Sequence, residues 1–283
     1  MIVARSVAEL RAALPEPGPR VGFVPTMGAL HDGHLSLVRA ARDATAVVVV
    51  SIFVNPLQFG PAEDLDTYPR DEAGDLELLR DARVDVVFLP AVAEMYPEGR
   101  ATTVSAGGIG EILEGATRPG HFDGVATVVT KLFNIVRPDA AWFGQKDAQQ
   151  LAVVRRIVDD LSMDVEINAG PTVREADGLA TSSRNVYLSS DERIRATALY
   201  SALRAGANVL QTERNVEATE KTMGETMTAE GVEVDYAVVV DPDDFTAFEW
   251  NGAALLAVAG RVGRSRLIDN LLLLPKPARH VEA

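Results

Sequence analysis

The chain has 283 residues, no cysteine and a net charge of −14, with 47% hydrophobic and 24% charged residues. The absence of cysteine excludes disulfides, thiolate nucleophiles and cysteine-ligated metals, and the acidic charge disfavours nucleic acid as a partner. No apolar run approaches the roughly 20 residues of a membrane span, and the first residues do not resemble a secretion signal, so no membrane association and a cytoplasmic location are expected. A small anionic substrate would need a local cluster of hydrogen-bond donors and cations.

Apolar runs that predict strands alternate with helical patterns along the first part of the chain. Strands are predicted at 20–24, 47–54, 84–89, 140–143 and 164–169, and helices at 34–43, 75–83, 125–136 and 148–161. This alternation indicates right-handed crossovers. It predicts an α/β fold with a Rossmann-like, doubly wound parallel sheet that carries helices on both faces.

The pattern changes after Pro171. A polar segment at 174–185 leads to a helix predicted at 190–211, and a second helix and strands at 234–240 and 254–259 follow. We therefore predict two domains. Residues 1–172 form the Rossmann-like domain and residues 173–283 a smaller C-terminal α+β domain, whose tail after Pro275 is expected to be frayed.

Three polar segments that contain glycine follow predicted strands, at residues 25–34, 55–60 and 144–150. Open parallel sheets bind their ligands at the carboxyl ends of the strands. Because these ends meet at one edge of a parallel sheet, the three segments predict one shared crevice.

The first segment contains His31-Asp32-Gly33-His34 at the predicted start of a helix. Gly28 and Gly33 would let the backbone approach a ligand closely, and the free N–H groups and dipole of a helix start favour phosphate. His31 and His34 are three residues apart, so both rings can face one anion and donate hydrogen bonds as charge moves to a leaving pyrophosphate. This pattern predicts an ATP-using enzyme that acts on the α-phosphate.

Two other interpretations of the histidine pair remain open. The pair could be half of a metal site, but the other histidines, His121 and His280, lie in no ligand-spaced cluster. It could also be two surface histidines beside a turn.

Further polar residues belong to the other segments. Lys146 follows a predicted strand and could reach a phosphate as a point charge, although loop lysines are commonly just solvated. The neutral amides of Gln58 and Gln150 suit a small substrate with hydroxyl and carboxylate groups. The run from Thr181 to Asn185 suits a polyphosphate but is also typical of a helix-capping loop. The sequence contains no P-loop, no Gly-x-Gly-x-x-Gly and no Gly-x-Ser-x-Gly motif, which disfavours P-loop hydrolases, the usual NAD enzymes and serine hydrolases.

Five blocks of the sequence resemble, in order, the pantoate–β-alanine ligase (pantothenate synthetase) family of the HxGH nucleotidylyltransferase superfamily. They are residues 25–34, 51–59, 118–125, 143–150 and 174–185, and a weaker similarity covers 266–270. The resemblance implies the ATP-dependent condensation of (R)-pantoate with β-alanine, which gives pantothenate, AMP and pyrophosphate through a pantoyl adenylate. It also implies a homodimer.

The resemblance further implies roles for individual residues. His34 would be the general acid, with His31 and Lys146 as further catalytic residues. Gln58 and Gln150 would bind pantoate, and Gln58 also β-alanine. The implied ATP-binding residues are Met27, Gly28, Ala29, Leu30, His31, Asp32, Gly33, His34, Gly144, Gln145, Lys146, Asp147, Val173, Thr181, Ser182, Ser183 and Arg184. On general chemical grounds, we expect Mg²⁺ to arrive mainly on the ATP phosphates, without a protein metal site. Because an acyl adenylate is prone to hydrolysis, we also expect the segment 174–185 to act as a lid that excludes water.

The chain departs from the family pattern in places. Gln145 stands where the family usually has glutamate and Thr181 where it usually has methionine, and residues 211–231 do not align. Two other functions stay open: a related nucleotidylyltransferase that acts on a phosphorylated alcohol, and a nucleotide-sensing or scaffold protein. A phosphorylated substrate would call for additional arginine or lysine near Gln58 and Gln150.

Overall fold

The structure, a computed structural model, describes residues 1–15, 18–61, 65–250 and 252–274. The chain forms two compact units, each built on its own sheet. The first unit comprises residues 1–145, 149–173 and 181–183, and the second comprises 146–148, 174–180 and the chain from 184 onward. The chain thus passes between the units at 145–149, well before the predicted boundary, and again at 173–184. The tail after Pro275, predicted to be frayed, lies outside the described residues.

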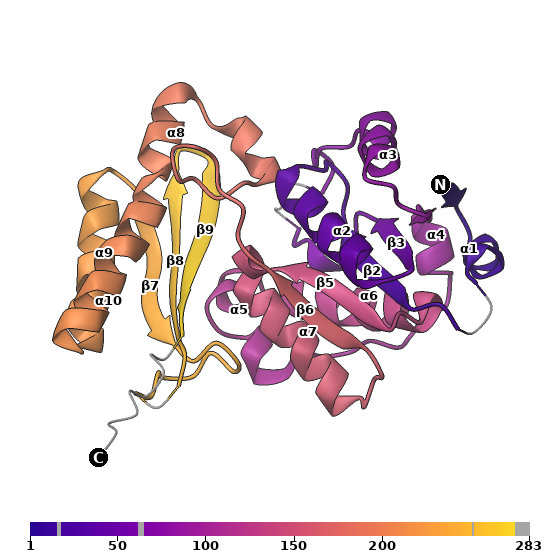
Figure 1. The fold of residues 1–283 in the computed structure, drawn as a ribbon. Coiled ribbons are helices and arrows are strands. Elements are labelled where there is room, and N and C mark those ends of the chain that lie inside the picture. Colours follow the sequence, from indigo (N-terminus) through magenta and orange to yellow (C-terminus); the bar gives the residue numbers. More distant parts are fainter. Residues whose placement is uncertain (16–17, 62–64, 251, 275–283) are drawn as a thin grey trace, which may run out of the picture. The chain divides into compact units, whose positions relative to one another are not determined.

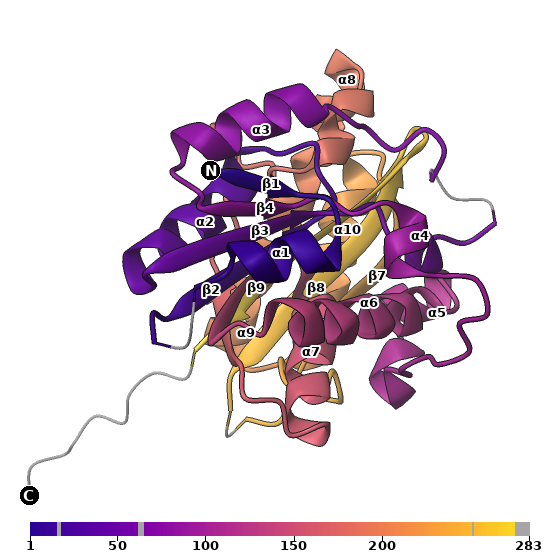
Figure 2. The same ribbon diagram turned by 90° about the vertical axis from the view of Figure 1, so that its right-hand side faces the viewer.

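The first unit contains a six-stranded parallel sheet with the strand order β1-β4-β3-β2-β5-β6 (Figures 1 and 2). The strands are β1 (Ile2–Ala4), β2 (Val21–Thr26), β3 (Val47–Ile52), β4 (Val86–Phe88), β5 (Ala140–Gly144) and β6 (Glu166–Gly170). The strand order reverses between β2 and β5, as it does in a doubly wound sheet. The predicted Rossmann-like fold is confirmed.

Helices cover both faces of this sheet because its strands are apolar on both sides. Val48 and Val50 of β3 pack into the core cluster with α2, whereas Val49 packs into the cluster with α1, α6 and α7. Figure 2 shows these helices around the sheet. The helices of this part are α1 (Val7–Ala13), α2 (Asp32–Ala44), α3 (Glu72–Asp81), α4 (Val92–Met95), α5 (Glu114–Thr117), α6 (His121–Val136) and α7 (Ala148–Asp160). Short 3-10 helices are η1 (Pro56–Gln58), η2 (Gly107–Gly110) and η3 (Gln145–Asp147). Strand β1 and helix α1 were not predicted.

The second unit is a three-stranded antiparallel sheet in the order β7-β8-β9, with α9 and α10 packed against it (Figure 1). Its elements are η4 (Ser183–Tyr187), α8 (Ser190–Ala196), α9 (Ala198–Glu213), α10 (Val216–Ala229), β7 (Glu233–Val240), β8 (Ala254–Val262) and β9 (Ser265–Leu273). The single helix predicted at 190–211 is wrong, because the chain forms two helices that separate at Thr197. Strand β9 was not predicted. None of the helices in the described part of the chain has the length and apolar character needed to cross a membrane.

Candidate active site

The segments predicted to share a crevice begin at neighbouring strand ends. Strands β3, β2 and β5 are adjacent and parallel. The segments that follow them therefore leave the sheet at one edge. Strands β2 and β5 also flank the position where the strand order reverses, which is where open α/β sheets bind ligands. The sheet thus brings the histidine segment, the Asn55–Gln58 turn and Gly144 to one place.

Helix α2 begins at Asp32, two residues before the predicted start, because His31 is its N-cap. Nδ1 of His31 accepts a hydrogen bond from the Gly33 N–H at 3.2 Å. Since that nitrogen accepts, the neutral ring carries its proton on Nε2. The His34 ring lies beside the His31 ring, with centroids 4.0 Å apart. The two imidazoles therefore form a pair at the N-terminus of the helix, where an anion is favoured.

Two glycines of this segment are needed for contacts within the protein. A Cβ on Gly33 would lie 2.9 Å from Cε1 of His31, so Gly33 makes room for the capping ring. Gly28 has φ +83°, and a Cβ there would lie 2.9 Å from Oδ2 of Asp75. Both glycines were predicted to let the backbone approach a ligand closely. The structure adds a second reason for each glycine, because a side chain there would lie too close to His31 or Asp75.

Asp75 of α3 supports the same loop, and sequence reasoning did not identify it. Its Oδ2 accepts the Ala29 N–H at 2.9 Å and its Oδ1 accepts the Leu30 N–H at 2.7 Å. Ala29 has φ 50°, a left-handed conformation that needs such support. Asp75 is only 3% exposed, and this burial raises the pKa of its carboxyl group although the two N–H donors act in the opposite direction. In the sequence, an acidic residue in the first turn of a helix looks like ordinary capping.

Gln58 is buried beside the loop. Its Nε2 donates to the Met27 sulfur at 3.1 Å, and its Oε1 accepts from Asn55 Nδ2 at 3.1 Å. The Tyr96 hydroxyl donates to Oδ1 of Asn55 at 2.8 Å. Burial raises the pKa of Tyr96 to about 12, so this hydroxyl keeps its proton at neutral pH. Asn55 and Tyr96 orient the Gln58 amide, a role that no sequence signal revealed.

Helix α6 holds the backbone of the same turn. A carbonyl only accepts and an arginine only donates. His121 Nδ1–H therefore donates to the Gln58 carbonyl at 2.8 Å, and its Nε2 accepts from Arg118 at 3.0 Å. A Cβ on Gly124 would lie 2.3 Å from the Leu57 carbonyl oxygen, so only glycine permits this close packing. His121 and Gly124 belong to a block that the resemblance included without assigning it a role.

Two adjacent glutamines at the start of α7 have different environments. Gln149 is 4% exposed, donates to the carbonyls of Ile109 and Ile112 at 2.7 and 2.8 Å, and accepts from the Glu114 N–H at 3.1 Å. Gln150 is half-buried, and no described residue forms a hydrogen bond with its amide. Gln149 therefore has a structural role, whereas the Gln150 amide can bind a ligand.

The remaining predicted residues fall into two groups. Gln145, Val173 and the run from Thr181 to Ser183 belong to the first unit, where the Thr181 N–H donates to the Val173 carbonyl at 2.9 Å. This contact is made by the backbone, so threonine in place of methionine does not affect it. Lys146, Asp147 and Arg184 belong to the second unit, and Lys146 Nζ lies 3.7 Å from Oδ1 of Asp147.

The described residues contain no group of three or more His, Cys, Asp or Glu side chains that could hold a metal ion. His280, considered above as a partner of the histidine pair, lies outside the described residues.

Comparison with known proteins identifies relatives over nearly the whole chain. A profile of the pantoate-beta-alanine ligase family matches residues 2–272. Pantothenate synthetase of Thermobifida fusca is 53% identical, with 96% of this chain and 95% of that protein covered. The crystal structure of pantothenate synthetase from Thermus thermophilus is 52% identical, covers 97% of this chain and 100% of that chain, and superimposes with a TM-score of 0.93.

A further crystal structure is informative about ligands. It is the pantoate-beta-alanine ligase of Francisella tularensis complexed with beta-gamma ATP and beta-alanine. It is 36% identical, with 96% of this chain and 97% of that chain covered, and its TM-score is 0.80.

Proposed function

The chain belongs to the pantoate-beta-alanine ligase family, and from that premise we propose that it joins (R)-pantoate to β-alanine with ATP, releasing AMP and pyrophosphate. The structural observation that carries the proposal is the His31–His34 pair at the N-terminus of α2, on the edge where the strand order reverses. The relative crystallised with ATP and β-alanine supports the two substrates. Nothing in the comparisons favours a phosphorylated alcohol as the acceptor.

In the first step, a carboxylate oxygen of pantoate forms a bond to the α-phosphorus, and the bond from that phosphorus to the bridging oxygen of pyrophosphate breaks. Negative charge then accumulates on the leaving group. The ring N–H groups of His31 and His34 and the first N–H groups of α2 stabilise that charge, with His34 as the general acid. The loop from Met27 to Leu30, braced by Asp75, lies along the nucleotide.

In the second step, the β-alanine amine attacks the acyl carbonyl of the adenylate, and AMP leaves. This step needs alignment of the two substrates but no enzyme nucleophile. Gln58 and Gln150 hold pantoate, and Gln58 also contacts β-alanine. Because the thioether of Met27 is a weak acceptor, a substrate oxygen would replace it as the partner of Gln58 Nε2 at little cost.

The other residues bind ATP. Lys146 neutralises phosphate charge, and Gly144, Gln145, Asp147, Val173 and the run from Thr181 to Arg184 complete the nucleotide site. The segment 174–185 acts as a lid that keeps water from the adenylate. Mg²⁺ enters on the ATP phosphates. The homodimer and the cytoplasmic location remain predictions.

The test is product formation from defined substrates. Protein, ATP, Mg²⁺, pantoate and β-alanine should yield pantothenate, AMP and pyrophosphate in equal amounts. Replacing pantoate with a phosphorylated alcohol, or ATP with CTP, should yield no product. Turnover of CTP with a phosphorylated alcohol, and none with pantoate, would contradict the proposal.

A further inference from the structure

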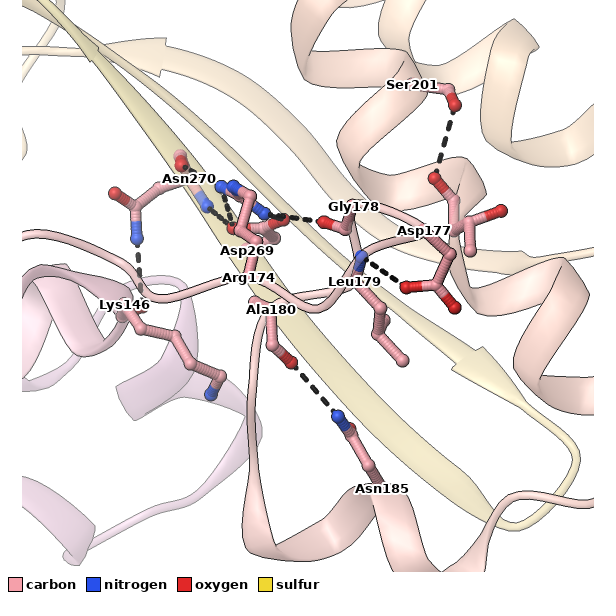
Figure 3. A network of polar contacts seen from close by, with 11 residues as sticks. Lys146, Arg174, Asp177, Gly178, Leu179, Ala180, Asn185, Ser201, Asp269 and Asn270 are labelled. Atoms are coloured by element: carbon pink, nitrogen blue, oxygen red, sulfur yellow. Dashed lines mark hydrogen bonds and ion pairs between the residues drawn. The ribbon is translucent and has the colours of Figure 1, made fainter. Parts of the chain in front are cut away.

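Two successive polar side chains of β9, Asp269 and Asn270, are almost completely buried, at 4% and 5% exposure. Successive side chains of a strand point to opposite faces, so the two residues reach different segments of the second unit (Figure 3). Asn270 Nδ2 donates to the Lys146 carbonyl at 2.8 Å. Asp269 accepts two hydrogen bonds from Arg174, at 2.6 and 2.9 Å.

Arg174 holds a small hairpin together. It pairs with Ala180 across the hairpin, its guanidinium donates to the Gly178 carbonyl at 3.2 Å, and it lies 3.9 Å from the centroid of the Tyr200 ring. The carboxylate of Asp269 therefore holds Arg174 in place, and Arg174 in turn holds the hairpin together.

The hairpin in turn holds the turn that carries Arg184. Asn185 Nδ2 donates to the Ala180 carbonyl at 3.1 Å (Figure 3) and to Glu175 Oε1 at 3.0 Å. Arg193 pairs with Glu175 at 2.7 Å and with Asp177 at 2.8 Å, which ties the hairpin to α8. A continuous series of contacts thus runs from Asp269 to the residue next to Arg184.

An Asp-Asn pair within an apolar strand is costly for the fold. Aspartate and asparagine are depleted in strands, and a buried ion pair is commonly no more stabilising than well-packed apolar residues. The buried polar pair fixes the geometry of two segments, and both segments carry a residue that the proposed function assigns to ATP.

We propose that Asp269 and Asn270 are positioning residues for adenylate formation. Asn270 fixes the backbone of Lys146, so that the ammonium is directed at the phosphates. Asp269 acts through Arg174 and the hairpin on the turn that contains Arg184. The proposal rests on the proposed function of Lys146 and Arg184, and neither Asp269 nor Asn270 needs to touch a substrate.

A double-mutant cycle tests the role of Asn270. Formation of the acyl adenylate is measured in single turnovers for the unmodified protein, Asn270→Ala, Lys146→Ala and the double variant. Loss of one hydrogen bond should slow Asn270→Ala about 5- to 10-fold with an unchanged KM for pantoate. In the Lys146→Ala background the same substitution should have no further effect. An equal loss in both backgrounds would mean a merely structural role and would overturn the proposal.

Control variants separate positioning from stability. Asn270→Leu keeps the side-chain volume without the donor and should reproduce the slow adenylate formation. Arg266, on the same strand, pairs with Asp235 at 2.5 Å. Arg266→Ala should therefore lower only the melting temperature. If Arg266→Ala slows adenylate formation as much as Asn270→Leu, the proposal is wrong.

The second arm uses Asp269→Asn, combined with Arg184→Ala in the same way. It should raise the KM for ATP about tenfold in the unmodified background and not in the Arg184→Ala background. If Asn270→Ala does not fold, the Asp269→Asn and Arg184→Ala variants still test the proposal. If the unmodified protein forms no adenylate, the proposed function fails. If it does but Asn270→Leu and Asp269→Asn behave normally, only the positioning proposal fails.

Discussion

The imidazole rings of His31 and His34 lie 4.0 Å apart, centroid to centroid, at the first turn of α2. The pair does two things at once. His31 caps the helix through Nδ1, and this bond leaves Nε2 as the protonated nitrogen of the neutral ring. The helix start and the ring N–H groups together favour an anion whose charge grows during the reaction.

We expect His34→Ala to slow adenylate formation by about 10²-fold or more, the scale of losing a donor to developing charge. Binding of ATP should change much less. Single-turnover measurement of pyrophosphate release gives the rate of this step. Near-normal release would remove the proposed role of His34.

His31→Ser is the matched variant, because serine is a good N-cap but too short to reach a phosphate. The melting temperature should stay close to that of the unmodified protein while adenylate formation falls. A variant that melts early and retains its rate would show that His31 serves only the helix.

Gln150→Ala should weaken pantoate far more than ATP, because no described residue forms a hydrogen bond with the Gln150 amide. The KM values for the two substrates give the comparison. Equal loss for both would mean that the assignment to pantoate is wrong.

The neighbouring Gln149→Ala provides the contrast. It removes an amide that makes three hydrogen bonds in the interior, so the free energy of unfolding should fall by about 2 kcal/mol or more. Its KM for pantoate should change less than that of Gln150→Ala.

Asp75→Asn should slow adenylate formation, because it replaces one of the two carboxylate oxygens that accept the N–H groups of Ala29 and Leu30 with an NH2 group that only donates. The substitution should also change how the stability of the protein depends on pH. Burial raises the pKa of Asp75 above its ordinary value of 3.8. As pH rises through this range, the unfolded chain therefore releases the proton first, and the unmodified protein loses stability that the variant retains.

Melting temperatures measured from acidic to neutral pH test this sign. Above pH 3.8, the melting temperature of the unmodified protein should fall relative to that of Asp75→Asn. This relative fall should stop once the pH exceeds the raised pKa of Asp75. A difference that moves the other way would show that the charged carboxylate is favoured in the folded protein.

Gly124→Ala should disturb the turn that holds Gln58, because its Cβ would lie 2.3 Å from the Leu57 carbonyl oxygen. We expect a loss of about 1–3 kcal/mol in the free energy of unfolding and a higher KM for pantoate. Gly224→Ala in α10 is the control, since nothing lies within 4 Å of a Cβ there. It should be neutral or stabilising by up to about 1 kcal/mol. Similar kinetics in both variants would contradict the role given to Gly124.

The sequence predicted the parts of the fold with strong local patterns. The valine run at 47–50 indicated a strand buried on both faces, and Val48 and Val49 do pack into different clusters. Strand β9 was missed because Asp269 and Asn270 interrupt its apolar pattern, and their partners, Arg174 and Lys146, are remote in sequence.

In the candidate site, too, residues were missed when their partners are remote in sequence. His31 and His34 were identified because they are close in sequence and lie at a strand-to-helix turn. Asp75 was not, because it meets Ala29 and Leu30 only after the chain has folded. Tyr96 was missed for the same reason, since it meets Asn55 only in the folded chain. Asn55 is close to Gln58 in sequence, but nothing in the sequence indicates that its side chain bonds the Gln58 amide.

The most direct test is incubation with ATP, Mg²⁺ and pantoate while β-alanine is withheld. The proposed mechanism predicts one equivalent of pyrophosphate per active site and a pantoyl adenylate bound to the enzyme, which yields pantothenate and AMP when β-alanine is added. Absence of both pyrophosphate and adenylate until β-alanine is present would contradict a two-step reaction through attack on the α-phosphorus.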